Sequence, residues 1–311
     1  MPLLRSPDWP LLIDLYFFLV GLSAGAFIAA GVADLFGGRR DRAVTKGGAY
    51  LALLALIPGA LFLVIDLGTP SRFLYMLWSP LGSTSIGEGS IAFLGFHFKF
   101  FSPMNVGAWM LLVYGACVAL TCLAIYLEDT KGEDRSGLRH IAGAVGACAA
   151  FFMAAYPGQL LAATARPFWA DARPLGALFL AVGATTGMAA VALILKAMGG
   201  EAVKSLGRLR KAYTLALVVQ ALAMLAVLVV GLSGPAWSAA AGQLLTSGRY
   251  AALFWLGAIV VGIIVPFVLE VRDGLFQGYR RGPGMVAVSA VLLLVGGFIT
   301  KYLITLAGQS V

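Results

Sequence analysis

Long apolar runs separated by short polar segments dominate the pattern along this chain. Eight runs reach about 20 residues, the length of an α-helix that crosses roughly 30 Å of hydrocarbon. The pattern predicts transmembrane helices over residues 11 to 33, 48 to 67, 106 to 127, 141 to 163, 174 to 198, 212 to 232, 251 to 270 and 284 to 307. An even number of crossings places both termini on the same side of the membrane.

The connections between these runs suggest how the helices are grouped. Residues 1 to 10 form an N-terminal segment outside the membrane, and residues 68 to 105 form the only long connection, which we expect to cover the outer face as a partly interfacial segment. Loop lengths suggest two bundles of four helices, over residues 11 to 165 and 166 to 311. We find no internal sequence repeat, which disfavours an inverted-repeat transporter.

Composition supports an all-α integral membrane protein. Hydrophobic residues make up 60% of the 311 positions, charged residues 12%, and the mean hydropathy is +0.92, far from the values of soluble domains. The first run is longer than a signal-peptide core, so we expect a retained helix although Ala24-Gly25-Ala26 resembles a cleavage site. Gly21, Gly25 and Ala29 recur at four-residue spacing there, which favours close helix packing.

The net charge of +8 reflects membrane topology and not a nucleic-acid partner. The basic residues stand in short clusters between the apolar runs and do not form one soluble face. With the N-terminus outside, the inner loops hold 15 of the 22 Lys and Arg residues and the opposite side holds 7. The positive-inside rule therefore predicts that the N- and C-termini both lie outside.

Metal-based chemistry within this chain has little support. His97 and His140 are the two histidines and are predicted on opposite sides of the membrane, so they cannot hold one haem together. Cys117, Cys122 and Cys148 lie in apolar runs without metal-ligand spacing, and we expect buried, reduced thiols. No Ser-His-Asp set, phosphate-binding loop or HExxH motif occurs. Any electrons must reach this chain from another protein.

Three polar residues lie near the outer ends of predicted helices: Asp14, Asp66 and Tyr156. Ionisable groups at such depth are costly and so are candidates for function. Two carboxyl groups and a phenol can form hydrogen bonds with quinone carbonyls and exchange protons with them, while apolar walls accept the ring and tail. We therefore interpret the three as a candidate quinone site.

Each of these residues also has a structural interpretation. Asp66 begins a helix-stopping sequence that ends at Pro70 and could pair with Arg72. Asp14 could favour the first turn of its helix through the helix dipole. Tyr156 precedes Pro157, which we expect to kink its helix, but a lone interfacial tyrosine often anchors a helix in the membrane interface.

The inner ends hold a second set of polar residues. Near the basic loops we expect solvated ion pairs, or less plausibly part of a proton path, at Asp34, Glu128, His140 and Glu270.

Four motifs in order resemble the NrfD/polysulphide-reductase membrane-subunit family. The first two are Leu15-Tyr-Phe-Phe-Leu-Val-Gly-Leu-Ser-Ala-Gly-Ala-Phe27 and Asp66-Leu-Gly-Thr-Pro-Ser-Arg-Phe-Leu-Tyr75. The others are Ser102-Pro-Met-Asn-Val-Gly-Ala-Trp109, and Tyr156-Pro-Gly-Gln-Leu-Leu followed by Arg166-Pro-Phe-Trp169 and Pro174-Leu-Gly-Ala-Leu-Phe-Leu. The resemblance covers residues 10 to 190 well. Two departures are Pro157, where the family commonly has threonine, and a longer connection between Arg72 and Ser102.

The resemblance implies a quinone-binding membrane anchor in a bacterial or archaeal cytoplasmic membrane. The quinone, menaquinone or ubiquinone, would lie near the outer ends of the first four helices, where Asp14, Asp66 and Tyr156 match family positions. Expected partners are a ferredoxin-like subunit with several iron–sulphur clusters and a molybdopterin catalytic subunit, and we expect no haem or iron–sulphur cluster in this chain. Substrate catalysis would then occur on the partner chains.

Two other functions stay open. A redox-coupled proton-translocating subunit would use inner residues such as Asp34, His140 or Glu270 and helix residues such as Thr185, Thr186 and Gln220. A redox-independent secondary transporter is the other alternative, and the family motifs speak against it.

Overall fold

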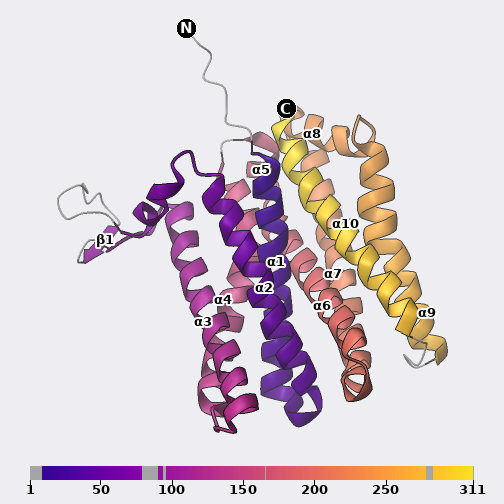
Figure 1. The fold of residues 1–311 in the computed structure, drawn as a ribbon. Coiled ribbons are helices and arrows are strands. Elements are labelled where there is room, and N and C mark those ends of the chain that lie inside the picture. Colours follow the sequence, from indigo (N-terminus) through magenta and orange to yellow (C-terminus); the bar gives the residue numbers. More distant parts are fainter. Residues whose placement is uncertain (1–8, 79–89, 94–95, 165, 278–282, 311) are drawn as a thin grey trace.

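The structure is a computed structural model that describes the chain except residues 1–8, 79–89, 94–95, 165, 278–282 and 311. Long helices stand side by side in one bundle (Figure 1). We call the end at which the first helix begins the upper end, as in Figure 1, and the opposite end the lower end.

Eight helical segments of the described residues are long and apolar enough to cross a membrane, which confirms the predicted all-α membrane fold. They are α1 (Leu11–Val32), α2 (Arg42–Ile65), α3 (Pro103–Lys131), α4 (Ser136–Ala162), α6 (Leu175–Met198), α7 (Leu206–Ser233), a wide helix (Leu253–Ile264) continuing as α9 (Val265–Gln277), and α10 (Pro283–Gln309). Because helix formation alone satisfies every backbone polar group within one segment, long apolar runs in lipid become helices.

Short elements connect these helices. At the upper end lie α5 (Pro167–Asp171), α8 (Ala236–Thr246), a 3-10 turn (Pro70–Met76) and the antiparallel strands β1 (Ser90–Phe93) and β2 (Phe96–Lys99). At the lower end α1 widens into a π-helical turn (Ala33–Gly37), and 3-10 turns (Gly38–Asp41 and Gly200–Ser205) precede α2 and α7. The hairpin in the long connection was not predicted.

Several helices extend beyond the predicted apolar runs. The runs predicted to start at 48, 106, 141 and 212 begin at Arg42, Pro103, Ser136 and Leu206, because polar residues continue the helical backbone outside the hydrocarbon layer. The helix α4 also continues through Pro157 to Ala162.

Small residues bring α1 and α6 into close contact, as the Gly21, Gly25 and Ala29 spacing predicted. A Cβ atom on Gly25 would overlap the carbonyl oxygen of Gly183, and one on Gly187 would overlap the backbone of α1 at Ala26. The helix α6 also packs against α4, α7 and α10. This interface joins the two predicted four-helix groups, whose division at residue 165 stays a prediction.

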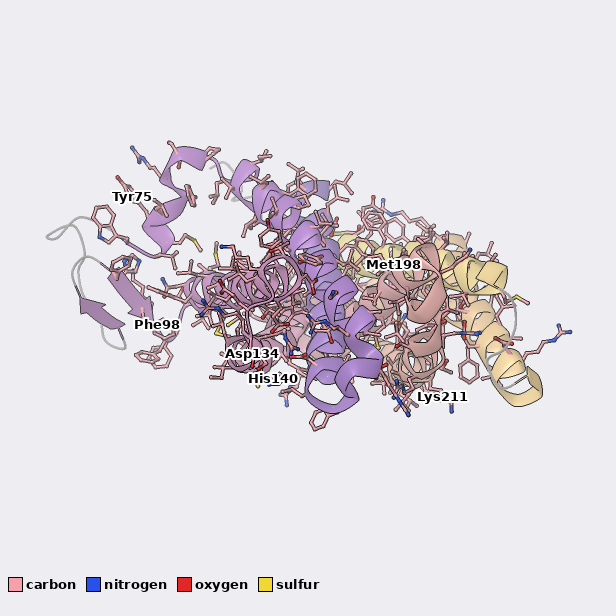
Figure 2. The ribbon with its side chains drawn as sticks, turned by 60° about the horizontal axis from the view of Figure 1, so that its bottom comes forward. Tyr75, Phe98, Asp134, His140, Met198 and Lys211 are labelled. Carbon is pink, nitrogen blue, oxygen red and sulfur yellow. The ribbon has the colours of Figure 1, made fainter. Side chains whose placement is uncertain are left out.

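Ion pairs hold the lower end together, and Asp34 and Glu128 are paired as predicted, but their side chains are only 7% and 9% exposed, so these pairs are not solvated. Arg139 pairs with Asp34, and its Nε lies 3.1 Å from Glu128. His140 Nε2 lies 3.6 Å from Asp34. Figure 2 looks toward this end and labels His140 beside Asp134.

The Glu270 pair departs from the prediction of solvated salt bridging. Its carboxylate accepts hydrogen bonds from Arg210 Nε at 2.8 Å and from the Tyr213 hydroxyl at 2.7 Å. The Arg210 Nη1 lies 2.5 Å from Asp273. Since the side chains of Arg210, Glu270 and Asp273 are all at most 1% exposed, this pair is an interior link between α7 and α9.

Both ends of the described chain meet at the upper end. The Trp9 backbone N–H donates a hydrogen bond to Gln309 Oε1 over 2.5 Å, and Gln309 Nε2 donates to the Trp9 carbonyl oxygen over 3.3 Å. This pairing agrees with an even number of crossings. Which side of the membrane this end faces stays a prediction.

Candidate functional site

A cavity of about 450 Å³ lies at the upper end, between the start of α1, the end of α2, the start of α3 and the end of α4. Its size falls within the range of small-molecule sites. Apolar side chains form most of its wall. The lining residues are Trp9, Pro10, Ile13, Tyr16, Phe17, Leu63, Asp66, Leu67, Pro103, Met104, Leu160, Ala163 and Thr164.

Aromatic rings form the α1 side of this cavity. The ring of Phe17 lies 5.7 Å from that of Trp9 and 5.6 Å from that of Tyr16. Behind them, Trp169 meets Trp9 edge-on at 5.9 Å, and Phe179 meets Phe17 edge-on at 6.1 Å. Edge contacts of this kind hold the rings in place, so the α1 side of the cavity is an aromatic wall that another ring can pack against.

Asp66 lines the cavity at the end of α2. It follows Ile65, the last residue of the helix, and its backbone N–H donates to the Phe62 carbonyl oxygen over 3.0 Å. Partial burial raises the pKa of the Asp66 carboxyl group above its usual value. No ion pair joins it to Arg72 among the described residues, so the proposed Arg72 partner is wrong in this structure.

Tyr156 lies in α4 directly beside the cavity wall. Its hydroxyl donates a hydrogen bond to the carbonyl oxygen of Pro103, which lines the cavity, over 3.1 Å. The ring stacks on Phe152 at 5.7 Å, and it occupies the space that a side chain at Gly107 would need. Glycine at 107 therefore allows α3 to approach the Tyr156 phenol.

Asp14 is buried in α1 and is not among the residues that line the cavity. It is 3% exposed, and its carboxyl group interacts with the Thr305 hydroxyl on α10. Its Oδ1 has no hydrogen-bond partner among the described residues. The structure thus brings Asp66 and Tyr156 to the cavity, while Asp14 contacts α10 through Thr305.

Sequence reasoning missed two residues of this region, Tyr16 and Lys301. Tyr16 lines the cavity, and its signal was its place in the first family motif. Lys301, counted only as a basic residue of the outer side, is fully buried in α10. Its Nζ donates to the Phe17 carbonyl oxygen over 2.7 Å and lies 5.2 Å from the centre of the Phe179 ring. An ionisable residue within an apolar run was the available signal.

The histidines lie at opposite ends of the bundle. His97 is in β2 beside the start of α3, where its carbonyl oxygen accepts a hydrogen bond from Trp109 Nε1 over 2.9 Å. His140 is near the lower start of α4 (Figure 2). The two cannot ligate one haem together.

The cysteines are free among the described residues, and none belongs to a group that could hold a metal ion. Cys117 and Cys122 are buried as predicted. The expectation of burial was wrong for Cys148, which is exposed on α4, because a residue of a membrane helix can face lipid.

The helix residues considered for proton translocation are buried in α6 and α7. Thr185 donates a hydrogen bond to Gln220 Oε1 over 2.7 Å, and Thr186 donates to the Val182 carbonyl oxygen over 2.7 Å. Both contacts satisfy polar groups within the bundle, and a proton path through them stays a prediction.

The sequence is similar to those of known membrane-complex subunits over nearly the whole chain. The C chain of polysulfide reductase from Wolinella succinogenes is 29% identical over 97% of this chain and 94% of its own length. The C subunit of selenate reductase from Mesobacillus selenatarsenatis is 25% identical over 93% of this chain and 71% of its own length. Protein NrfD from Escherichia coli is 26% identical over 97% of this chain and 94% of its own length.

The family match extends well beyond the region that the four motifs cover. The family model described as "Polysulphide reductase, NrfD" matches residues 5–311, including the helices after residue 190. The chain is a multi-pass membrane protein that belongs to the NrfD polysulphide reductase family.

Proposed function

We propose that this chain is the quinone-binding membrane subunit of an oxidoreductase complex, with the quinone in the cavity between α1, α2, α3 and α4. The observation that carries the proposal is an apolar cavity of about 450 Å³ with Asp66 at its wall and the Tyr156 hydroxyl bonded to Pro103 beside it. A quinone needs apolar walls for its ring and tail and a few polar groups that fix its carbonyls.

The cavity residues have distinct roles in this proposal. Trp9 and Phe17 hold the quinone ring by packing, and Leu63 and Met104 contact its tail. Asp66, whose pKa is raised by partial burial, holds or releases a proton at the cavity wall. When bound, the quinone supplies a carrier of two electrons and two protons.

Tyr156 serves as a hydrogen-bond donor that can turn from the Pro103 carbonyl oxygen toward a ligand. Its 3.1 Å bond to a backbone oxygen keeps the phenol satisfied without a ligand. We propose that Asp14 also contacts the quinone, but its carboxyl group interacts with Thr305 in this structure. Asp14 would therefore reach the quinone only after a small movement of α1.

The electrons are proposed to come from a separate iron–sulphur subunit, with a molybdopterin subunit beyond it. Two of the relatives are named as components of polysulfide and selenate reductases, which supports membership of a multi-subunit complex. The complex would lie in a prokaryotic cytoplasmic membrane. Exposed aromatic residues near the cavity, including Phe73, Tyr75 and Phe101, offer a docking surface at the upper end.

Filling the cavity tests the proposal. Ala163 lines it and is exposed, so Ala163→Phe should occupy ligand space without a clash in the core. We would purify the chain with its co-eluting partners, extract the lipids and quantify quinone per chain. The expected result is quinone in the wild type and at least about a ten-fold loss in Ala163→Phe.

Ala119→Phe is the matched control, because Ala119 is exposed on α3 and does not line the cavity. It should retain wild-type quinone. Absence of quinone from the wild-type complex, or equal quinone in both variants, would refute the assignment of this cavity.

A further inference from the structure

A second apolar groove runs along the lower half of the bundle, away from the candidate quinone cavity. It has a volume of about 430 Å³ and lies between α1, α6 and α7. Its inner surface is made largely of small residues, among them Gly25, Ala29, Ala33, Ala184 and Ala212. Because these side chains are small, they leave a groove that larger side chains would fill.

The groove has the length of one leaflet of a bilayer. On α1 it extends from Gly25 to Phe36, eleven residues further along, or about 16 Å along a helix axis. The hydrocarbon core of a bilayer is roughly 30 Å thick. The groove therefore begins near the middle of the membrane and ends near its lower surface.

Among the lining residues that the structure describes, the polar side chains lie at the lower mouth of the groove. Arg208 Nη2 lies 2.7 Å from Asp41 Oδ1, and the Ser205 hydroxyl donates to the Arg40 carbonyl oxygen over 2.7 Å. The Arg208 side chain is 55% exposed, whereas that of Asp41 is 10% exposed. Arg208 therefore has donors left for another anion.

Further cations stand near this mouth. Arg40 is exposed, and so is Lys211, one helical turn after Arg208 (Figure 2). Asp41 is the acidic residue of the groove lining and is already paired. Arg40 and Arg208 thus supply two positive charges at the mouth against the one negative charge of Asp41, below an apolar slot.

We propose that this groove binds an anionic phospholipid. One acyl chain lies against Gly25, Ala29 and Ala184, and the phosphate is held by Arg208 and Arg40 at the lower membrane surface. Basic pockets between transmembrane helices suit lipid headgroups because the acyl tail and the phosphate are recognised together. A quinone does not fit as well, since it has no negative charge for the basic mouth.

The lipid also has a structural task at this site. The wide turn Ala33–Gly37 and the 3-10 turn Gly200–Ser205 both end at the mouth. The lipid fills the space that these turns leave open between α1 and α7.

Defined bilayers test the proposal. We would place the full-length chain in nanodiscs of equal phosphatidylglycerol and phosphatidylcholine with identical acyl chains, release it, and count retained lipids by native mass spectrometry. The wild type should retain phosphatidylglycerol preferentially. Arg208→Gln should lower that retention about three- to five-fold, and Asp41→Asn should raise it because an acidic competitor is removed.

Arg135→Gln is the matched charge control. Arg135 is also exposed at the lower end and paired with an acid, Glu133, at 2.8 Å, but it lies in the connection between α3 and α4. It should retain wild-type amounts of phosphatidylglycerol. Equal retention of both lipids by the wild type, or an equal effect of Arg135→Gln and Arg208→Gln, would overturn the proposal.

A second pair of variants tests the groove itself. Ala212→Phe fills the slot from an exposed position on α7 and should lower retention of the lipid, whereas Ala119→Phe on α3 should not. If Ala212→Phe retains the lipid fully, the acyl tail binds elsewhere and the groove assignment is wrong. Recovery of a quinone in place of phospholipid from this groove would overturn the proposal equally.

Discussion

The Tyr156 hydroxyl donates a hydrogen bond to the Pro103 carbonyl oxygen over 3.1 Å and so joins the upper part of α4 to the first residue of α3. This bond places a phenol at the edge of an apolar cavity without exposing it. The same bond links a structural contact to the proposed quinone chemistry, and the two contributions can be separated by measurement.

Tyr156→Phe removes the hydroxyl and keeps the ring stacked on Phe152. We expect quinol-linked turnover of the complex to fall about ten-fold or more, while the free energy of unfolding falls by only about 1 kcal/mol. Turnover and thermal stability of the purified complex measure both. Tyr126→Phe is the control, since Tyr126 is an exposed tyrosine of α3. Unchanged turnover in Tyr156→Phe would mean that the hydroxyl is only structural.

Asp66→Asn should change how stability depends on pH. Burial raises the pKa of Asp66 above 3.8, so the folded protein holds this proton more tightly than the unfolded chain. The contribution of Asp66 therefore favours folding at pH below 3.8 and is lost as pH rises through the raised pKa. As the pH is raised through the pKa of Asp66, the melting temperature of the wild type should fall relative to that of Asp66→Asn. A series of thermal-shift measurements at increasing pH measures this difference.

Asp134 provides a control of opposite sign. Hydrogen bonds from the Ser136 hydroxyl and backbone N–H lower the pKa of Asp134. Its contribution is present above the unfolded pKa and is lost as pH falls. If Asp66→Asn shifted the pH profile in the same direction as Asp134→Asn, the burial of Asp66 would be the wrong explanation.

Gly21→Ala should be destabilising because of Lys301. A Cβ atom at position 21 would overlap Lys301 Nζ, whereas its distance of 3.5 Å to Lys301 Cε is an ordinary contact. We expect a loss of about 1–3 kcal/mol, and Lys301→Met should relieve it because methionine ends one atom earlier. A double-mutant cycle of thermal stabilities measures this coupling.

Gly187→Ala is the comparison for that cycle. Its Cβ atom would overlap backbone atoms of α1, including Ala26 N, which no change at Lys301 can move. Lys301→Met should therefore leave the loss of stability caused by Gly187→Ala unchanged. Equal rescue of both glycine variants would show that Lys301→Met acts in some other way.

Glu270→Gln should be far more costly than loss of a surface pair. The buried Arg210 would lose its ion pair with Glu270, whose carboxylate lies 2.8 Å away, and would keep its ion pair with Asp273. Breaking a buried pair costs about 3 kcal/mol, whereas Glu133→Gln at an exposed pair costs about 0–1 kcal/mol. Thermal unfolding of both variants measures the difference, and similar melting temperatures would contradict the interior role of Glu270.

Hydropathy predicted the number and approximate places of the spans because the bilayer imposes both a length and a composition on each helix. It could not predict their ends, since Arg42 and Ser136 are polar and still helical. The depth of polar residues in the predicted helices, together with the family motifs, singled out Asp66 and Tyr156, which lie at or beside the cavity. Neither depth nor motifs showed that Asp14 faces α10, because the rotation of a helix about its axis is set by its neighbours, and α1 is apolar on nearly every side.

The burial of Lys301 could not be predicted from the sequence either. Its position in an apolar run was visible, but its partners, the Phe17 carbonyl oxygen and the Phe179 ring, lie 284 and 122 residues earlier in the chain. Such pairings depend on which helices become neighbours. The apolar pattern of a single helix does not determine which helices become its neighbours.

The packing of Asp14 against Thr305 has a consequence for how the chain is made. Because synthesis runs from the N-terminus, α1 is made well before α10, so the Asp14 carboxyl group is in place before the Thr305 hydroxyl that it contacts has been made. A chain truncated before α10 leaves an acidic residue facing lipid or a neighbouring helix without its partner. A fragment that lacks α10 should therefore expose on α1 a carboxyl group that the eight-span bundle buries, so α10 is needed to make α1 compatible with lipid.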